Sequence, residues 1–177
     1  VENVEAAIEH NVEILTVSNK IELPAAETER VMEEIEKSIG LDCTNAVLVS
    51  AKSGIGIKEL IDKLIDVIPP PKGDQTKPLK AVIYDSWFDS YLGALAIVRV
   101  FDGELKRGQA IKVMSTGKDY SVQNLTYPHP LHPESTDSIK PGEIGILVTG
   151  LKSVKELRVG DTVTYAKNPC TESVGEF

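Results

Sequence analysis

The sequence has little that would mark a membrane or secreted protein. No apolar run approaches the roughly 18 residues that a membrane-spanning helix needs, and no signal peptide is recognisable. The two cysteines, Cys43 and Cys170, lie far apart in loop-like contexts, which is typical of a reducing compartment rather than of a disulfide-stabilised fold. These absences favour the cytoplasm, and they leave open a peripheral attachment to the inner face of the cell membrane.

Two motifs that hold nucleotide phosphates are also missing. No G-x-x-x-x-G-K-[S/T] segment is present to cradle phosphates, and no D-x-P-G segment is present to organise a magnesium ion and a terminal phosphate. The chain begins at Val1 rather than Met, inside a pattern that places Val1, Val4 and Ile8 on one helical face. We therefore expect a fragment, with no catalytic residue, no metal ligand and no tightly bound cofactor of its own.

Charge is distributed unevenly along the chain. Residues 1–74 hold 15 acidic and 7 basic residues, whereas residues 75–177 hold 12 of each. The acidic part is unsuited to binding nucleic acid directly, because neutralising phosphates requires clustered Lys and Arg. The neutral part leaves RNA contact open. Such a change in composition favours two domains.

The first 70 residues alternate between helical and strand patterns. Apolar runs at 13–17 and 46–49 predict two buried strands. A helix is expected to begin after Pro24 and to end at Gly40, and another carries an apolar stripe from Ile57 to Ile68. This alternation predicts parallel strands joined by crossover helices.

The remainder of the chain has the pattern of a small β-barrel. Three prolines from Pro69 end the last helix, and a stiff polar linker is expected at 71–78. Short strands separated by turns are then predicted at 79–84, 95–101, 110–114, 120–125, 143–148 and 162–165. Six strands in so short a segment predict a closed barrel over 79–170, with 171–177 starting a further linker or domain. The proline-rich stretch 127–133 is expected to be a surface loop.

Polar residues follow both strands predicted in the first part. The tetrad NKIE occupies 19–22, and the triad SAK occupies 50–52. Ligands of open α/β sheets lie just outside the carboxyl ends of the strands, so one small ligand could contact both clusters. They resemble the N-K-x-D and S-A-K guanine-recognition motifs of GTPases, with Glu22 in place of Asp.

Each of these residues would have a different part in recognising the guanine base. The Glu22 carboxylate would accept two hydrogen bonds from guanine that adenine cannot supply. The Lys20 stem would lie along the base, the Asn19 amide would tie the two loops together, and the Ala51 N–H would meet the guanine oxygen. The predicted guanine-nucleotide-binding residues are Asn19, Lys20, Glu22, Ser50, Ala51 and Lys52.

Further segments make the resemblance more specific. IPPPKGD at 68–74, PLKA at 78–81, YDSWFDSY at 84–91 and MSTGK at 114–118 are similar to the LepA, or elongation factor 4, family of translational GTPases. So are GEIG at 142–145, GLK at 150–152 and VGDT at 159–162. The fold class is accordingly expected to be α/β plus all-β. Residues 1–70 would form the C-terminal part of a P-loop-type GTPase domain, and 79–170 the translation-factor barrel known as domain II.

The resemblance implies a function for the intact protein. That protein would bind GTP or GDP with Mg²⁺, hydrolyse GTP on the ribosome and move tRNAs backward by one step, or assist initiation or assembly. Its barrel would contact the small subunit and 16S RNA. The chain alone is expected to hydrolyse no GTP and to self-associate through its first 70 residues. The alternatives are a ribosome-protection factor and a non-enzymatic adaptor with a degenerate nucleotide fold.

Other polar groups have simpler interpretations. Asp85 and Asp89 are expected to cap turns in a loop between strands rather than to act in catalysis. His129 and His132 are expected in a solvated loop rather than at a metal site.

Two clusters leave an RNA contact open. Trp87, Phe88 and Tyr91 are expected to cover one end of the barrel, with stacking on RNA bases as the alternative. A basic cluster could contact phosphates or remain solvated; its members are Lys106, Arg107, Lys112 and Lys118.

Overall fold

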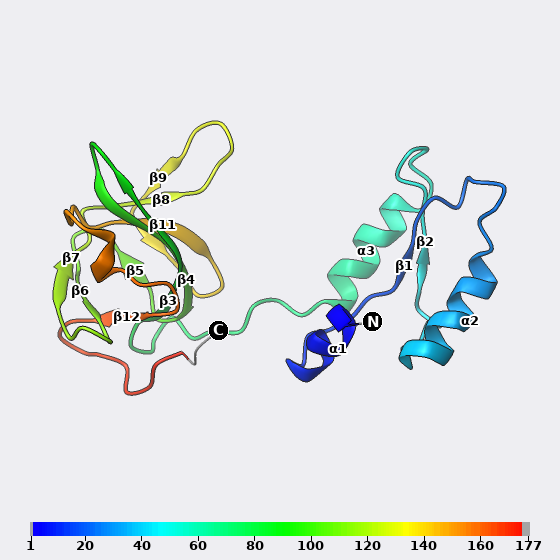
Figure 1. The fold of residues 1–177 in the computed structure, drawn as a ribbon, viewed down its shortest axis with the longest axis horizontal. Helices are drawn as coiled ribbons and strands as arrows, with labels where there is room; N and C mark the ends of the chain where they lie inside the picture. The colour runs from blue at the N-terminus through cyan, green and yellow to red at the C-terminus, as the bar shows by residue number, and fades with distance from the viewer. Residues whose placement is uncertain (1, 175–177) are drawn as a thin grey trace. The chain divides into compact units, whose positions relative to one another are not determined.

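The computed structural model describes residues 2–174, and the chain divides into two compact units, Val1–Pro70 and Pro71–Phe177 (Figure 1). The predictions for Val1 and for residues 175–177 lie outside the described residues. No helix of the described part is long and apolar enough to cross a membrane.

The first unit alternates helices and strands as predicted. Its elements are α1 (Glu2–Glu9), β1 (Val17–Ser18), α2 (Thr28–Ile39), β2 (Val47–Leu48) and α3 (Ile57–Val67). The two strands pair in parallel, Val17 with Val47 and Ser18 with Leu48. Figure 1 shows α2 and α3 on either side of this pair. Each strand is shorter than its apolar run: β1 takes only Val17 from the run 13–17, and β2 takes Val47 and Leu48 from the run 46–49.

The start predicted for the second helix is wrong. Helix α2 begins at Thr28, because the residues after Lys20 form two consecutive turns instead. Leu23 donates its backbone N–H to the Lys20 carbonyl at 3.1 Å, and Ala26 donates to the Leu23 carbonyl at 3.0 Å. The helix ends as predicted at Gly40, whose φ of 77° is left-handed.

The first unit buries few side chains. Among its described residues, those that are buried are Cys43, Val47, Val49 and Ser50, and none lies in a helix. Ile61, Leu64 and Ile65 of α3 remain 54%, 47% and 71% exposed. A parallel pair is normally covered on both faces by more apolar surface than these helices provide.

The second unit is a β-barrel built mainly from antiparallel strands. Its strands are β3 (Lys80–Asp89), β4 (Gly93–Asp102), β5 (Leu105–Lys106), β6 (Ala110–Val113), β7 (Asp119–Ser121), β8 (Asn124–Tyr127), β9 (Glu134–Thr136), β10 (Ser138–Ile139), β11 (Ile144–Val148) and β12 (Thr162–Tyr165), with a 3₁₀ turn, η1 (Val154–Glu156). Eight of them form one sheet in the order β7-β6-β12-β3-β4-β11-β8-β9, and β5 pairs with β10.

One segment closes the barrel. The strand predicted at 120–125 is divided at Val122 and Gln123 into β7, which pairs with β6, and β8, which pairs with β11. Between them, Val122 donates its N–H to the Gln109 carbonyl, and Gln123 donates to the Val148 carbonyl, each at 2.9 Å. Because β7 and β8 are consecutive pieces of one chain segment, that segment joins β6 to β11 and closes the ring of strands.

Alternation along the strands fills the interior. Ala94, Ala96, Val98 and Val100 of β4 point inward and are fully buried, as every second residue of a strand should be. The remaining fully enclosed side chains of this core include Leu79, Ile83, Leu105, Ile111, Val113, Leu125, Ile139, Leu147, Leu157 and Val163.

The run at 84–91 is not a loop between strands. Strand β3 continues through it to Asp89 and pairs with β4 up to Asp89–Gly93, so the two strands extend together as a hairpin, the arm. Asp89 does cap the turn, since its Oδ1 accepts the N–H groups of Tyr91 and Leu92 at 2.8 and 2.9 Å. The short strands β5, β9 and β10 were not predicted, because two- and three-residue strands leave no periodicity.

The aromatic residues of the arm do not cover the barrel end. Trp87 is 37% exposed, Phe88 55% and Tyr91 95%, so the prediction of core packing is wrong. The β3 side of the arm is exposed, whereas Ala94 and Ala96, which lie opposite it on β4, are buried.

The predicted linker is held against the barrel. The Asp74 N–H donates to Asp102 Oδ1 at 2.8 Å, and the Gly103 N–H donates to the Asp74 carbonyl at 2.9 Å. Gly103 has a φ of 73°, and a Cβ there would lie 2.6 Å from Leu79 Cα. This close backbone approach therefore requires glycine.

We predict that Gly103→Ala destabilises the barrel by about 3 kcal/mol, because left-handed strain and a clash with rigid backbone add together. Urea unfolding followed by the fluorescence of Trp87, the single tryptophan of the chain, would measure it. Gly117→Ala is the matched control, since Gly117 has a φ of 66° but nothing within 4 Å of its added Cβ. A loss of about 1 kcal/mol is expected there. Equal losses for both variants would contradict the packing argument.

Candidate functional site

Two loops meet where β1 and β2 end. Because the strands are parallel, Asn19 and Val49 follow them at the same edge. The Val49 N–H donates to the Ser18 carbonyl at 2.8 Å, and the Ile21 N–H donates to the Val49 carbonyl at 3.3 Å. The backbone pairing therefore continues past the strands and sets the two loops side by side.

The Asn19 side chain connects the loops. Its Oδ1 accepts the backbone N–H of Ala51 at 3.1 Å and that of Lys20 at 2.8 Å. The predicted tie between the loops is thus present. The same contact changes the expectation for Ala51, because its N–H is directed at Asn19, and a base oxygen would have to share or replace that bond.

Lys20 has an unusual backbone conformation. Its φ of 66° is left-handed, which costs a residue with a side chain roughly 1–2 kcal/mol. The conformation turns the chain sharply after Asn19, and the Lys20 carbonyl then accepts the Leu23 N–H. Strain of this kind persists where surrounding contacts fix the backbone, and it often accompanies ligand sites.

Ser50 acts on the Glu22 carboxylate. Its side chain is fully buried, and its Oγ accepts the Ser53 N–H at 3.2 Å, which leaves the hydroxyl proton to donate elsewhere. A hydrogen bond from Ser50 lowers the pKa of Glu22, assisted by the Glu22 backbone N–H and the Lys20 charge. Glu22 is therefore ionised at neutral pH. The contribution of the Ser53 N–H was not predicted, because backbone donors leave no signal in a sequence.

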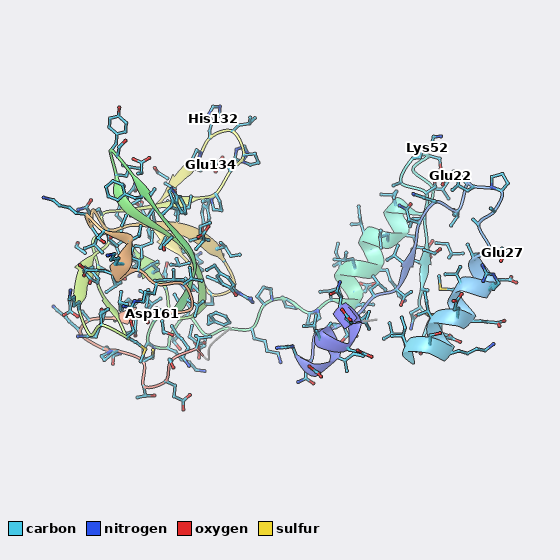
Figure 2. The ribbon with its side chains drawn as sticks, viewed as in Figure 1. Glu22, Glu27, Lys52, His132, Glu134 and Asp161 are labelled. Carbon is cyan, nitrogen blue, oxygen red and sulfur yellow. The ribbon has the colours of Figure 1, made fainter. Side chains whose placement is uncertain are left out.

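Lys52 belongs to a tight loop at the same edge. The Ser50 N–H donates to the Ile55 carbonyl at 2.9 Å, and the Gly54 N–H donates to the Ser50 carbonyl at 2.8 Å. Figure 2 shows Glu22 and Lys52 at the same end of the first unit. All six predicted residues thus lie on two adjoining loops, and the Lys52 side chain has no hydrogen-bond or ion-pair partner within residues 2–174.

The cations of the predicted basic cluster form ion pairs on the barrel surface. Lys106 pairs with Glu104 at 3.2 Å and Arg107 with Asp137 at 2.7 Å. Lys112 pairs with Asp119 at 2.8 Å, and Lys118 with Glu156 at 3.1 Å. Each cation thus lies beside a carboxylate, and both interpretations of the cluster, a solvated face or a contact to phosphates, stay predictions.

The two histidines form a turn rather than a metal site. His129 Nδ1 accepts the N–H groups of Leu131 and His132, each at 3.2 Å. Figure 2 shows His132 on the loop between β8 and β9, with Glu134 at the start of β9. Within residues 2–174, no group of three His, Cys, Asp or Glu side chains is placed to hold a metal ion.

Comparison with solved proteins assigns the class of the fold. Residues 93–164 match the family model described as elongation factor Tu domain 2. The chain superposes with a TM-score of 0.72 on the apo crystal structure of translation elongation factor SelB from Methanococcus maripaludis, covering 93% of this chain and 36% of that one at 22% identity. It superposes with a TM-score of 0.65 on the crystal structure of a bacterial selenocysteine-specific elongation factor, EF-Sec, covering 90% and 28% at 22% identity. The chain therefore shares its fold with parts of these two elongation factors.

Sequence relatives narrow the resemblance to elongation factor 4. The chain is 60% identical over 175 residues to elongation factor 4 of Wolinella succinogenes, 58% to that of Sulfurimonas denitrificans and 56% to that of Campylobacter fetus. The resemblance to the LepA family is therefore confirmed over 99% of this chain. The chain spans about 29% of the length of these relatives.

We predict that Ser50→Ala raises the pKa of Glu22 toward its ordinary value, because the largest cause of its lowering is removed. In the wild type, Glu22 stays ionised to a lower pH than a free glutamate; in the variant it becomes protonated earlier as the pH falls. Carboxyl ¹³C NMR titration of the labelled chain would measure the shift. Ser53→Ala should leave Glu22 unchanged, since Ser53 contributes its backbone N–H. Identical Glu22 titrations in Ser50→Ala and the wild type would refute this contact.

Proposed function

We propose that this chain is the guanine-recognition and barrel segment of a ribosome-dependent translational GTPase of the elongation factor 4 type. The observation that carries the proposal is the Asn19–Ala51 hydrogen bond, which joins the two recognition motifs beside an ionised Glu22. The intact protein would bind GTP or GDP with Mg²⁺ and hydrolyse GTP on the ribosome. The six residues of the two loops would supply the contacts to the base.

Base selection follows from the charge of Glu22. An ionised carboxylate accepts hydrogen bonds from the ring N–H and the exocyclic amine of guanine together. Adenine offers an acceptor in place of that ring N–H, which would leave a buried pair of acceptors facing each other. Because the Glu side chain is one methylene longer than Asp, its position is set by the Ser50 hydroxyl. Ser50 is thereby the positioning residue for base recognition.

The proposal also includes a role for the intact protein in translation. The intact protein would move tRNAs backward by one step, and its barrel would lie against the small ribosomal subunit and 16S RNA. We place this activity in the cytoplasm, where ribosomes translate. Contact with the inner face of the cell membrane stays a prediction from the sequence.

We predict that the parent protein, extended to its own start codon, binds fluorescent GDP saturably and that ATP does not compete. Glu22→Ala should weaken binding at least about 30-fold, because two hydrogen bonds to a charged acceptor are lost. Glu59→Ala on α3 removes the same charge outside the two loops and should leave the affinity within about twofold. A fluorescence titration measures the affinity of the wild type and of the two variants for GDP. Absence of guanine-selective binding in the wild type would favour the non-enzymatic adaptor instead.

We also propose that the isolated chain self-associates through its first unit. The open edges of the β1–β2 pair and the exposed α3 side chains Ile61 and Ile65 support this. Sedimentation velocity should show dimers or larger species that decrease in the variant carrying Ile61→Glu and Ile65→Glu. Leu131→Glu is the control, since Leu131 is 76% exposed on the barrel unit. A wild-type chain that stays monomeric at high concentration would disprove the proposal.

A further inference from the structure

Strand β3 has an open edge along the arm. Its pairing with β12 ends at Val82. The next residue makes the last two bonds on that side: the Ile83 N–H donates to the Asp161 carbonyl at 3.0 Å, and the Ile83 carbonyl accepts the Gly160 N–H at 2.8 Å. Among the described residues, no strand pairs with β3 on that side from residue 84 to residue 89, where β4 is its only partner. An open edge of this kind can pair with a strand from another chain.

The backbone groups of Phe88 point toward this edge. Phe88 pairs with Ala94, whose N–H is directed away from β3, to the Leu151 carbonyl at 2.7 Å. In an antiparallel pair, two opposite residues either exchange both backbone bonds or both point away, so Phe88 directs its N–H and carbonyl away from β4. By the same alternation Ser86 does so too, and its N–H is taken by Asp85 Oδ1 at 2.8 Å. No described residue bonds to the Phe88 N–H, the Phe88 carbonyl or the Ser86 carbonyl, so these groups can receive a further strand.

Three side chains share one face of the arm beside this edge. Asp85, Trp87 and Asp89 alternate along β3, so they project to the same side. The other face carries Phe88 and its partner Ala94, which belongs to the barrel core. The three side chains therefore lie on the face that is turned away from the core, where a partner can reach them.

This face carries negative charge. Asp85 and Asp89 are the only charged residues from Tyr84 to Leu92. Each uses Oδ1 to accept backbone N–H groups, and neither forms an ion pair within the described part of the chain. Hydrogen bonds from the Leu92 and Tyr91 N–H groups lower the pKa of Asp89, so that carboxylate stays ionised. Two carboxylates on either side of an indole ring suit a cation, because the charges attract it and the ring face can bind it.

We propose that the open edge of β3 over residues 84–89 binds an extended, positively charged peptide segment of another protein as an additional strand. The peptide backbone bonds to Phe88 and to the Ser86 carbonyl, which is how extended peptides add to open sheet edges. A Lys or Arg side chain of the peptide lies over Trp87, between the two carboxylates. The edge supplies affinity through the backbone, and the charged face selects a cationic sequence.

Two other occupants match this surface less closely. If the β3 edges of two copies paired antiparallel about Trp87, Asp85 of each copy would lie opposite Asp89 of the other, and like charges directly opposite are destabilising. A nucleic acid could stack on the aromatic rings, but its phosphates would meet the two carboxylates. A cationic peptide satisfies the backbone groups and the charges together.

The first test uses the 177-residue chain and a peptide of about eight residues in which arginine alternates with valine. The peptide has no aromatic residue, so the tryptophan fluorescence comes from Trp87 alone, the single tryptophan of the chain. At about 50 mM salt, the fluorescence should change saturably with a Kd below about 1 mM. Asp85→Asn with Asp89→Asn should weaken binding about tenfold, since asparagine keeps the Oδ1 acceptor and loses the charge.

A matched variant controls for net charge. Glu134→Gln with Glu172→Gln removes the same charge from the barrel unit outside the arm, on β9 and after β12. Its affinity for the peptide should stay within about twofold of the wild type. Near-ultraviolet circular dichroism would establish that each variant remains folded.

A second test addresses the backbone pairing. Saturating peptide should slow the hydrogen exchange of the Phe88 amide at least about tenfold, as followed by ¹⁵N NMR, while the Trp87 amide, which faces β4, stays unchanged. Two methylated peptides complete the test, one blocked at its valine nitrogens and one at its arginine nitrogens. Because the N–H groups of alternate residues face the same edge, one of the two should bind at least about tenfold more weakly than the other.

Several results would overturn the proposal. They are the absence of saturable binding, equal losses in the two double variants, equal affinities of the two methylated peptides, and an unprotected Phe88 amide. A peptide of alternating glutamate and valine that binds as tightly would assign the surface to the neighbouring cations Lys152 and Lys155 instead. Dimers that are lost in Trp87→Ala would assign it to a second copy, and tighter binding of oligouridine than of the peptide would assign it to RNA. The guanine-nucleotide titration concerns the first unit alone, so the two proposals succeed or fail separately.

Discussion

Closure of the barrel depends on the backbone hydrogen bonds of one bent segment, residues 119–127. Its first part pairs with β6 and its second with β11, so the segment covers the free edges of both strands at once. An unpaired edge would expose a row of N–H and C=O groups to other chains. Closure removes that row, and it fixes β3 and β4 firmly enough for their ends to project as the arm.

The first unit organises its site by a different constraint. Only four strand residues pair, yet their parallel direction brings Asn19 and Val49 to one edge. The two loops are then held by side-chain oxygens: Asn19 joins backbone to backbone, and Ser50 joins backbone to the Glu22 carboxylate. A small number of strand bonds thus suffices to position six residues, because the polar side chains continue the pairing where the strands end. The geometry of the site therefore depends on the side chains of Asn19 and Ser50 as much as on the strands.

Much of this arrangement was predictable from the sequence, for physical reasons that differ between elements. Strand β12 and helix α3 were located closely, because their apolar periodicity is matched by their burial or amphipathic face and their ends carry Gly or Pro. The arm was missed, because YDSWFDSY has no alternation: none of residues 84–89 is buried, so no pattern of burial is imposed on this part of β3. The start of α2 was misplaced, because Pro24 suits a helical first turn and a loop equally well.

The sequence predicted which residues form the candidate site but not the hydrogen bonds that they make. The spacing of NKIE and SAK after two strands was enough to bring them together, whereas the use of the Ala51 N–H by Asn19 depends on the left-handed turn at Lys20, which no residue type there signals. Non-glycine residues seldom adopt that conformation, so sequence statistics argue against it. Tertiary contacts override the local preference, as they often do where a backbone is shaped for a ligand.

The charge of the second unit shows how the net charge of a segment differs from the arrangement of its charges. Equal numbers of acids and bases in residues 75–177 suggest no attraction for nucleic acid. The structure arranges those charges in two ways: Lys106, Arg107, Lys112 and Lys118 each lie beside a carboxylate, while Asp85, Asp89 and Asp161 accept backbone N–H groups and keep their negative charge. Acids and bases that cancel in the sum therefore do not all meet in space. The local field, which steers a charged partner, depends on the position of every ionised group, whether or not it has an ion-pair partner.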